Sequence, residues 1–356
     1  MTSRERVTAA LRHVEPDRTP VFEYVLLPPV GKQILGRPCC DYVCADPGWP
    51  SLVAELGWEH AVRRYAADRV ELAVRLGHDL LYVVPAPPPC HPTAPPVVAQ
   101  ETDDPVERMR RRTCLAKEYW APPNQDSFLV YQCLQEEMGR QDLDLPILAP
   151  AYAHGVWTDV DLMQALLLAP EIAHQHFGFA TRSALALIEQ YLRLGIAQIG
   201  VGGDFSGTRP LISPHAYRSF IVPEVRTLSR RIHAAGGWAV NASDGDLWPV
   251  IEDFLIGCEV DGYLEIDESA GMDMRRLKAA YGSRITFYGN MDCGSTLSFG
   301  TPDAIRQATR ECLSAGLGDG GHVFCASNAI TESVSLTNYL AMVNAYREFW
   351  GLAAFE

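Results

Sequence analysis

The sequence predicts an α/β fold, specifically a single-domain (β/α)8 (TIM) barrel with an insertion after its second strand. The chain has 356 residues, of which 47% are apolar, and this suits one such barrel with added loops around a large core. Short apolar runs also alternate with helix-like stretches. Eight runs of this kind occur, the number that closes a parallel barrel.

The eight predicted strands are short, and several are apolar at consecutive positions, as expected for strands that are covered on both faces. They are residues 20–24, 79–84, 146–150, 198–201, 238–241, 262–266, 285–288 and 322–325.

Helical segments separate most of these runs. Residues 163–192 are rich in Ala and Leu and predict one long helix. Ser213 followed by Pro214 has the pattern of an N-cap with proline at the first helical position. Apolar residues then recur at helical spacing until Gly236 and Gly237, which should end the helix. These apolar positions are Phe220, Ile221, Val225, Leu228 and Ile232.

Residues 85–145 do not show this alternation of predicted strands and helices. The segment opens with seven prolines between positions 85 and 96, and residues 97–133 look irregular or β-like. We therefore interpret 85–145 as an irregular insertion within one barrel domain that spans residues 1–356. Residues 31–50 form a long loop after the first strand, and a loop in that place can cover a site.

The charge of the chain limits its partners. Its formal net charge is −14, which disfavours nucleic acid and anionic membrane surfaces as partners. The first 18 residues are charged and polar, unlike a signal peptide, and no apolar run is long enough to span a bilayer. We expect a cytoplasmic protein, and we expect its ten scattered cysteines to be reduced thiols.

Polar residues follow the predicted strands at their carboxyl ends, where the active site of a (β/α)8 barrel lies. They are Asp204, Asp244, Asp246, Glu265, Asn290 and Asp292. Carboxylates that converge there would repel one another unless they were protonated or bound to a cation. A divalent metal held by Asp204, Asp244 and Glu265 would relieve the repulsion. For Asp246 and Asp292 the alternative role is capping the next helix.

Other residues admit both a structural and a functional interpretation. Cys39, Cys40, Cys44, Cys90 and His91 match no standard zinc spacing and are best interpreted as ordinary thiols and a loop histidine. Cys325 lies inside a predicted strand and should fill the barrel. Trp157 and Phe205 are core or pocket-wall candidates, and the two glycine pairs at 202–203 and 320–321 match no phosphate-binding loop.

Several segments resemble the uroporphyrinogen decarboxylase superfamily. Residues 241–250 (NASDGDLWPV) resemble its stretch after strand five, and residues 281–292 (YGSRITFYGNMD) resemble its strand seven. Residues 1–20, 301–305 and 320–331 also have counterparts in the superfamily. The resemblance implies a barrel with one of two chemistries: decarboxylation of uroporphyrinogen, or methyl transfer to or from a corrinoid, which is usually carried by a separate protein. Some of these methyltransferases use zinc.

The residues of this chain disfavour two versions of that chemistry. Decarboxylases of this superfamily carry an Arg-rich loop after strand one, whereas residues 22–29 contain no Arg and include Glu23. Lys32 and Arg37 come only later. A substrate with eight carboxylates is difficult to bind without arginines at that loop. The zinc ligands of the methyltransferases fall here at Ala242, Asp244 and Asn328, a set that lacks the usual His and Cys.

We therefore expect a methyltransferase that moves a methyl group between a small methylated substrate and a corrinoid on a partner protein. A methyl ether donor needs an acid to protonate its leaving oxygen. The candidate catalytic residues are Glu23, Tyr24, His154 and Asp204. The candidate substrate-binding residues are Tyr152, Arg209, Asn290 and Asn328. The alternatives are uroporphyrinogen decarboxylase and a non-catalytic barrel that binds a corrinoid or another ligand.

Overall fold

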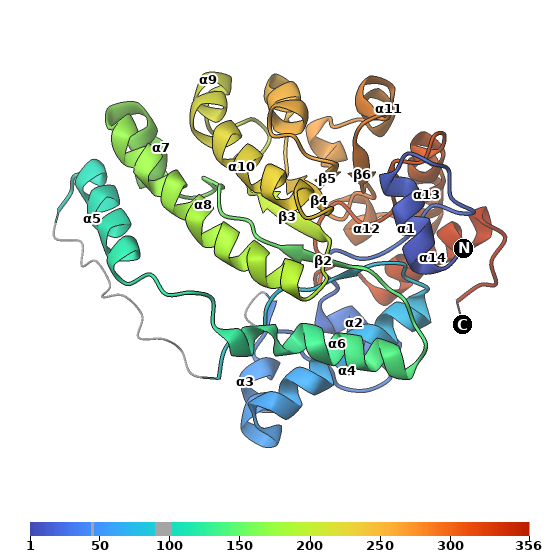
Figure 1. Cartoon of the computed structure of the whole chain (residues 1–356). Coiled ribbons are helices and arrows are strands. Elements are labelled where there is room, and N and C mark those ends of the chain that lie inside the picture. The colour runs from blue at the N-terminus through green and yellow to red at the C-terminus, as the bar shows by residue number, and fades with distance from the viewer. Residues whose placement is uncertain (44–45, 90–101, 356) are drawn as a thin grey trace. The chain divides into compact units, whose positions relative to one another are not determined.

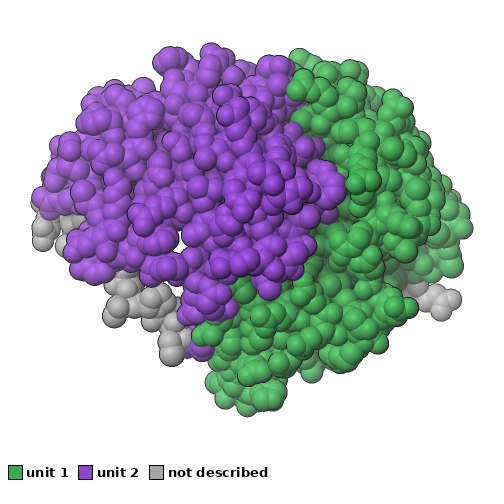
Figure 2. All heavy atoms as spheres, in the orientation of Figure 1, with its two compact units in different colours: residues 1–87, 126–148, 262–356 green, residues 88–125, 149–261 purple. Residues whose placement is uncertain are grey.

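The computed structural model describes residues 1–43, 46–89 and 102–355, in which helices and strands alternate along the chain (Figure 1). The chain divides into two compact units, which Figure 2 shows in different colours. Unit 1 consists of residues 1–87, 126–148 and 262–356, and unit 2 of residues 88–125 and 149–261. One barrel domain over residues 1–356 stays a prediction.

The elements of unit 1 come from three stretches of the chain. Its helices and strands are α1 (Ser3–Leu11), α2 (Pro28–Leu35), α3 (Gly48–Leu56), α4 (Trp58–Leu76), β1 (Leu81–Tyr82), η2 (Gln125–Phe128), α6 (Leu129–Arg140), β5 (Gly262–Leu264), η6 (Glu268–Ala270), α11 (Met274–Tyr281), β6 (Thr286–Tyr288), α12 (Thr296–Phe299), α13 (Pro302–Gly316), β7 (His322–Val323) and α14 (Leu336–Phe349).

Unit 2 contains one helix from residues 88–125 and the elements that follow the middle of β2 (Ile147–Pro150). Its elements are α5 (Pro105–Glu118), α7 (Val160–Leu168), α8 (Pro170–Arg193), β3 (Gln198–Gly202), α9 (Pro214–Ala216), η3 (Tyr217–Ile221), α10 (Val222–His233), β4 (Trp238–Ala242), η4 (Trp248–Val250) and η5 (Asp253–Gly257).

The strands confirm the predicted α/β class. Within each unit the hydrogen-bonded strands are consecutive along the chain and parallel: β1 with β2, β3 with β4, β5 with β6, and β6 with β7. Seven of the eight predicted runs contain a strand, and almost all of their residues are buried. Helices connect these strands, which is the repeating unit of a parallel α/β fold.

The first predicted strand, residues 20–24, is not a strand among the described residues. Val21 makes a single parallel bridge with Phe324, and the Phe324 amide donates to the Pro20 carbonyl at 2.7 Å. Pro20 has no N–H to donate. The amide of Val21 donates to the Asp79 side chain at 3.1 Å instead of to a neighbouring backbone carbonyl. A side chain thus replaces part of the hydrogen-bond ladder, and the prediction of eight regular strands was wrong by one.

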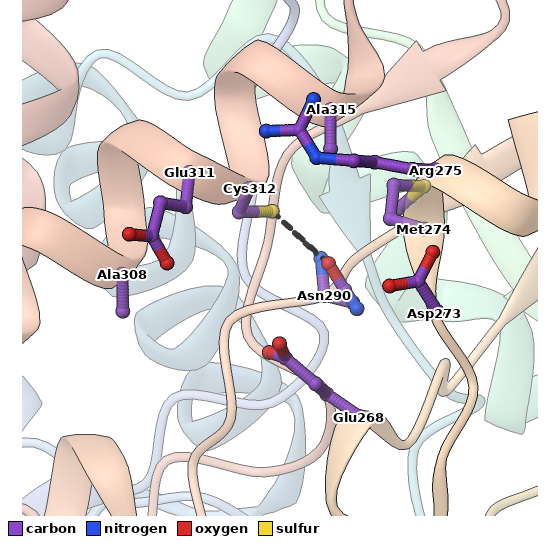
Figure 3. Close-up of a pocket in the computed structure, with 9 residues that line it drawn as sticks. All are labelled: Glu268, Asp273, Met274, Arg275, Asn290, Ala308, Glu311, Cys312 and Ala315. Carbon is purple, nitrogen blue, oxygen red and sulfur yellow. Dashed lines mark hydrogen bonds between the residues drawn. The ribbon is translucent and has the colours of Figure 1, made fainter.

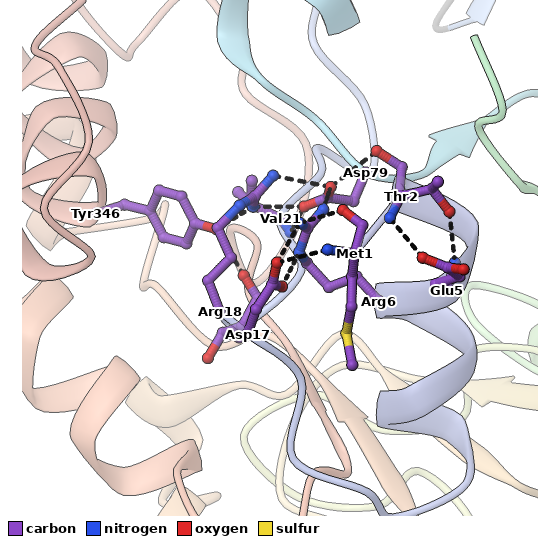
Figure 4. Close-up of polar contacts among 11 residues, drawn as sticks. Met1, Thr2, Glu5, Arg6, Asp17, Arg18, Val21, Asp79 and Tyr346 are labelled. Atoms are coloured by element: carbon purple, nitrogen blue, oxygen red, sulfur yellow. Dashed lines mark hydrogen bonds and ion pairs between the residues drawn. The ribbon is translucent and has the colours of Figure 1, made fainter.

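Asp79 also fastens the amino-terminal helix α1 to the start of β1 (Figure 4). Its side chain is fully buried and receives Arg6 at 2.7 Å and Arg18 at 2.6 Å. Ser3 donates to the same carboxylate at 2.9 Å. Two guanidinium groups and two further donors compensate the cost of burying this charge.

The predicted helix over residues 163–192 is two helices, α7 and α8. The chain breaks at Ala169, whose φ of −149° and ψ of 67° are not helical, because Pro170 disfavours helical geometry in the residue before it. The helix predicted after Ser213 is confirmed. The Ser213 side chain accepts the Ala216 amide, and the helical chain runs through α9, a π-helical stretch (η3) and α10 to His233.

The insertion differs from the prediction. The expectation of irregular or β structure over residues 97–133 is wrong for the described part, because residues 105–118 and 129–140 are the helices α5 and α6. Asp104 caps α5, and Pro105 occupies its first turn. The prolines of residues 85–96 favour irregular structure, and for this reason the helices that follow them were not predicted. Among the described residues, no helix is long and apolar enough to span a membrane.

Candidate functional site

Two of the predicted metal ligands lie together in unit 2. Asp204 follows β3 and Asp244 follows β4, and carboxylate oxygens of the two lie within 4.8 Å of each other. The Asp244 amide donates to the Asp204 carboxylate at 3.4 Å. Both residues are half-buried. Because β3 and β4 are parallel neighbours in register, their carboxyl ends bring these side chains to one edge.

Glycines fix the position of Asp204. A Cβ on Gly155 would lie 2.9 Å from the Asp204 carbonyl oxygen, and one on Gly203 would lie 2.8 Å from the Gly155 nitrogen. The two loops therefore touch through their backbones. The amides of Val156 and Trp157 donate to the Asp204 carbonyl at 2.7 and 3.1 Å. Gly203 thus allows two loops of the chain to approach each other closely.

Glu265, the third predicted ligand, belongs to unit 1 and directly follows β5. It is buried, and its backbone has a φ of 71°. A non-glycine residue in this left-handed region is strained, and such residues cluster at functional sites.

Glu23 has a strongly perturbed carboxyl in unit 1. Its side chain is 3% exposed, and burial raises the pKa of the carboxyl to about 8. The Ala326 amide, the Tyr339 hydroxyl and the charge of Arg69 all oppose this rise in pKa without cancelling it. The Ala326 amide donates to the carboxylate at 3.3 Å. Glu23 is therefore largely protonated at neutral pH and can donate a proton.

Sequence reasoning did not identify the residues around Glu23. Arg69 lies on α4 and is buried, with its guanidinium donating to the Tyr82 carbonyl at 3.1 Å. Tyr339 lies on α14 and is fully buried. Both sit in helices far from strand ends, so only their unusual burial, which a sequence does not display, could have marked them. Tyr24, the neighbour of Glu23, packs its ring 4.4 Å from that of Tyr82.

His154 has a mainly structural environment. It is fully buried, and its Nε2 lies 2.8 Å from the Thr181 hydroxyl, which in turn donates to Glu224 at 2.5 Å. Since Thr181 gives its proton to Glu224, it accepts one from the imidazole. Burial lowers the pKa of His154 to about 4. The imidazole is therefore neutral at physiological pH, which disfavours it as a proton donor.

The four predicted substrate-binding residues lie in different surroundings. Tyr152 packs its ring against Gly200 of β3, so closely that a Cβ there would lie 2.7 Å away. Arg209 is exposed in a turn closed by the Ser206–Pro210 bridge. Asn328 is half-buried and accepts the following amide, that of Ala329, at 2.6 Å. Asn290 lines a pocket of unit 1, described below.

Several residues for which both a structural and a functional role were considered have a structural role. Asp246 accepts the amide of Trp248 at 3.0 Å, and Asp292 accepts that of Thr296 at 2.7 Å, so both cap turns. Cys325 is fully buried in the core of unit 1. Burial raises the pKa of Cys39 to about 12, so it is a thiol rather than a thiolate. Cys44, Cys90 and His91 lie outside the described residues.

A thiolate-rich zinc site does not fit this chain. Ala242, at one expected ligand position, is buried at the end of β4 and has no donor atom. The neighbouring Asn241 uses its amide within the fold, donating to the Phe254 carbonyl at 3.2 Å and accepting the Ala242 amide at 3.0 Å. The remaining donors in unit 2 are the oxygens of Asp204 and Asp244, which suit a harder divalent cation.

Parallel strands joined by helices, with acidic residues after the strands, define a protein of the parallel α/β class. The family profile described as Uroporphyrinogen decarboxylase (URO-D) matches residues 150–349. The chain belongs to this family. Residues 1–149 lie outside the matched region.

Relatives of both known chemistries match the chain. It is 26% identical over 192 residues to a methylated-thiol–coenzyme M methyltransferase from Methanosarcina mazei, covering 54% of this chain and 47% of the relative. It is 34% identical over 188 residues to a uroporphyrinogen decarboxylase from Pseudomonas savastanoi pv. phaseolicola, covering 50% and 49%. The chain thus matches about half the length of these curated relatives.

A solved structure extends the likeness of the fold to nearly the whole chain. A methyltransferase from Methanosarcina mazei superposes with a TM-score of 0.69 over 98% of this chain and 99% of its own, at 18% sequence identity. At that identity the likeness shows the fold alone. The chain therefore shares the overall fold of that structure.

Proposed function

We propose that this protein transfers a methyl group from a small methylated substrate, such as a methyl ether, to a corrinoid carried by a partner protein. The observation that carries the proposal is the buried Glu23, whose pKa is raised to about 8. A methyl ether needs a proton on its oxygen as the carbon–oxygen bond breaks, and an acid with a pKa near the working pH supplies it best.

In this proposal each residue has a defined task. Glu23 gives its proton to the leaving oxygen while the methyl group passes to the acceptor, which leaves an alcohol or phenol and a Glu23 carboxylate. The corrinoid, when bound, supplies the nucleophile for the methyl group. Tyr24 and Tyr152 give the substrate aromatic walls, and Arg209 and Asn328 are candidate polar contacts. His154 positions its loop, since its imidazole is buried and neutral.

A divalent metal is part of the proposal but not of the proton transfer. Asp204 and Asp244 would hold it, and Glu265 would join them if the strand ends converge as they do in a closed barrel. The metal would orient an oxygen of the substrate and polarise it. Carboxylate ligands make magnesium, manganese or zinc acceptable ions here.

Decarboxylation of uroporphyrinogen is the second candidate function, favoured by the relatives of that name. The composition of the loop after residue 22 argues against this decarboxylation. The segment 22–29 contains no arginine and leads into α2, whose first residue is Pro28. Eight substrate carboxylates would meet the carboxyl of Glu23 there instead of guanidinium groups.

The test uses the purified full chain with reduced cobalamin and a panel of methyl ethers and methylated thiols. Methyl transfer changes the absorbance of the corrinoid, and we expect at least one ether to produce that change. Glu23→Gln should abolish the reaction, whereas Glu137→Gln, which alters a buried acid on α6, should retain it. Coproporphyrinogen formed from uroporphyrinogen, with no methyl transfer from any donor, would overturn the proposal.

A further inference from the structure

Unit 1 contains a pocket that the proposed methyl transfer does not use (Figure 3). It has a volume of about 280 Å³ and lies where η6, the start of α11 and α13 meet. Its polar lining consists of Glu268, Asp273, Arg275, Asn290 and Glu311, with Cys312 behind Asn290. A volume of this size suits a small organic molecule.

The carboxylates give the pocket a negative charge. Three carboxylates face one guanidinium there. The pKa of Glu268 is raised by its partial burial and by the charges of Asp292, Asp273 and Glu311. Two of the three acids have partners: Asp273 caps α11 by accepting the Arg276 amide at 2.7 Å, and Glu311 accepts the Gln307 amide at 2.6 Å. Within the described ranges, the side-chain carboxylate of Glu268 has no hydrogen bond or ion pair, although its backbone carbonyl accepts the Gly271 amide.

Asn290 presents a second polar group to the pocket. The residue is 2% exposed, and its Oδ1 accepts the Cys312 thiol at 3.2 Å. Its amide nitrogen, Nδ2, donates to no described residue, and in Figure 3 the side chain points into the pocket between Glu268 and Asp273. This nitrogen reaches the open space of the pocket, where an acceptor of a ligand can meet it.

The lining excludes a simple metal site. Among the described residues, ligand atoms of Glu268, Asp273 and Glu311 do not form a group of three within 4.8 Å of one another. The carboxylates are too far apart to surround one ion, but separate ammonium groups on one molecule could reach them. Arg275 and the Asn290 amide are both donors and call for a carboxylate at the other end of the ligand.

We propose that this pocket binds a basic amino acid. Its ammonium groups lie against Glu268 and Glu311, and its carboxylate accepts from Arg275 and the Asn290 amide. This pairing satisfies the free Glu268 carboxylate and the free Asn290 donor with one molecule. The site is separate from the proposed methyl transfer and does not depend on it.

The test is calorimetric titration of the full chain with three related probes: lysine, cadaverine, which lacks the carboxylate, and norleucine, which lacks the side-chain ammonium. We expect lysine to bind with one molecule per chain, and cadaverine and norleucine each to bind about tenfold more weakly, since each loses one charge-assisted contact. Magnesium, calcium and zinc should not compete with lysine.

Variants separate the two ends of the ligand. Glu268→Gln should weaken lysine and cadaverine alike, by about tenfold. Arg275→Gln should weaken lysine only, because cadaverine has no carboxylate. Both residues are exposed, so the fold should tolerate the changes. Glu252→Gln, an exposed acid of unit 2, and Arg284→Gln serve as controls and should bind lysine normally.

Three outcomes would overturn the proposal: no binding of lysine at tens of millimolar, equal binding of lysine and norleucine, or displacement of lysine by a metal ion that Glu268→Gln no longer binds. Loss of methyl transfer with lysine binding intact would contradict the proposed function and leave this site standing.

Discussion

The backbone amide of Ala326 donates to the carboxylate of Glu23 at 3.3 Å, joining the segment after β7 to the segment before α2. This bond and the charge of Arg69 favour the ionised form of Glu23, but burial outweighs both and raises the pKa to about 8. Glu23 is therefore largely protonated at neutral pH, and it lies where an amino-terminal segment contacts the segment after β7.

Glu23→Gln should remove methyl transfer while keeping the fold. Glutamine has the same shape and can still accept the Ala326 amide, but it cannot release a proton to an oxygen leaving group. Loss of a general acid lowers the rate by about 100- to 10,000-fold. The measurement is the initial rate of corrinoid methylation. A donor with a better leaving group, such as a nitrophenyl methyl ether, should lose much less rate, and equal loss with both donors would contradict the assignment.

The ionisation of Glu23 should lower the stability of the protein as the pH rises from about 4.5 to about 8, against the opposite contribution of buried histidines such as His154 below about pH 6.5. In the unfolded chain Glu23 ionises near its ordinary pKa of 4.5, whereas in the fold it stays protonated until about 8. Unfolding in this interval releases a proton, so stability decreases with increasing pH. Urea unfolding at several pH values measures this slope. Glu23→Gln should remove this contribution, so that the stability of the variant falls less, or rises more, with pH than that of the wild type. An unchanged slope in the variant would show that Glu23 titrates normally.

Asp79→Asn should be strongly destabilising. Asp79 is fully buried and joins Arg6 to Arg18, so the change leaves two guanidinium groups without their shared counter-charge. Breaking such a buried pair costs about 3–5 kcal/mol. Asp144→Asn is the matched control, because its ion pair with Arg4 is 53% exposed on both sides and should be worth under about 1 kcal/mol. Urea unfolding of both variants gives the comparison.

Asp204→Asn and Asp244→Asn should each reduce the content of divalent metal in the purified protein. Their carboxylate oxygens lie within 4.8 Å of each other, and an amide ligates a cation more weakly than a carboxylate does. Asp292→Asn is the control, because that carboxylate caps the turn before α12. Elemental analysis after dialysis against the metal is the measurement. Equal metal content in all four proteins would rule out this pair as ligands.

The strands could be predicted because their signal is local. Residues 198–201 and 238–241 are short, mostly apolar runs, and β3 and β4 cover them with one additional residue each. Residues 20–24 are also mostly apolar, but the exchange of a backbone partner for the Asp79 side chain is a contact between distant positions. Helix α5 was missed for a different reason, since the proline-rich sequence before it outweighed its clear cap at Asp104.

The site was predictable only in outline. Positions at strand ends follow from the strand pattern, so Asp204, Asp244 and Glu265 could be named. Burial is a tertiary property, and it separates Glu23, whose pKa rises, from His154, whose pKa falls. The direction of the Asn290 side chain, toward Cys312 of α13 and a pocket, depends on helix packing that no local pattern encodes.

His154 should remain neutral between pH 5 and 8, whereas His233 should titrate. Burial lowers the pKa of His154 to about 4, and the bond to Asp261 raises that of His233 above its ordinary 6.5. Nuclear magnetic resonance of the ring protons should show a moving signal for His233 and a fixed one for His154. In the unfolded chain His154 binds a proton below about 6.5, so its contribution to stability is present above that pH and is lost as the pH falls towards 4. His154→Gln should remove the share of this acid sensitivity that belongs to His154, and the share of His78, His176 and His322 should stay. Titration of the His154 signal near pH 6.5 would contradict its buried, neutral state.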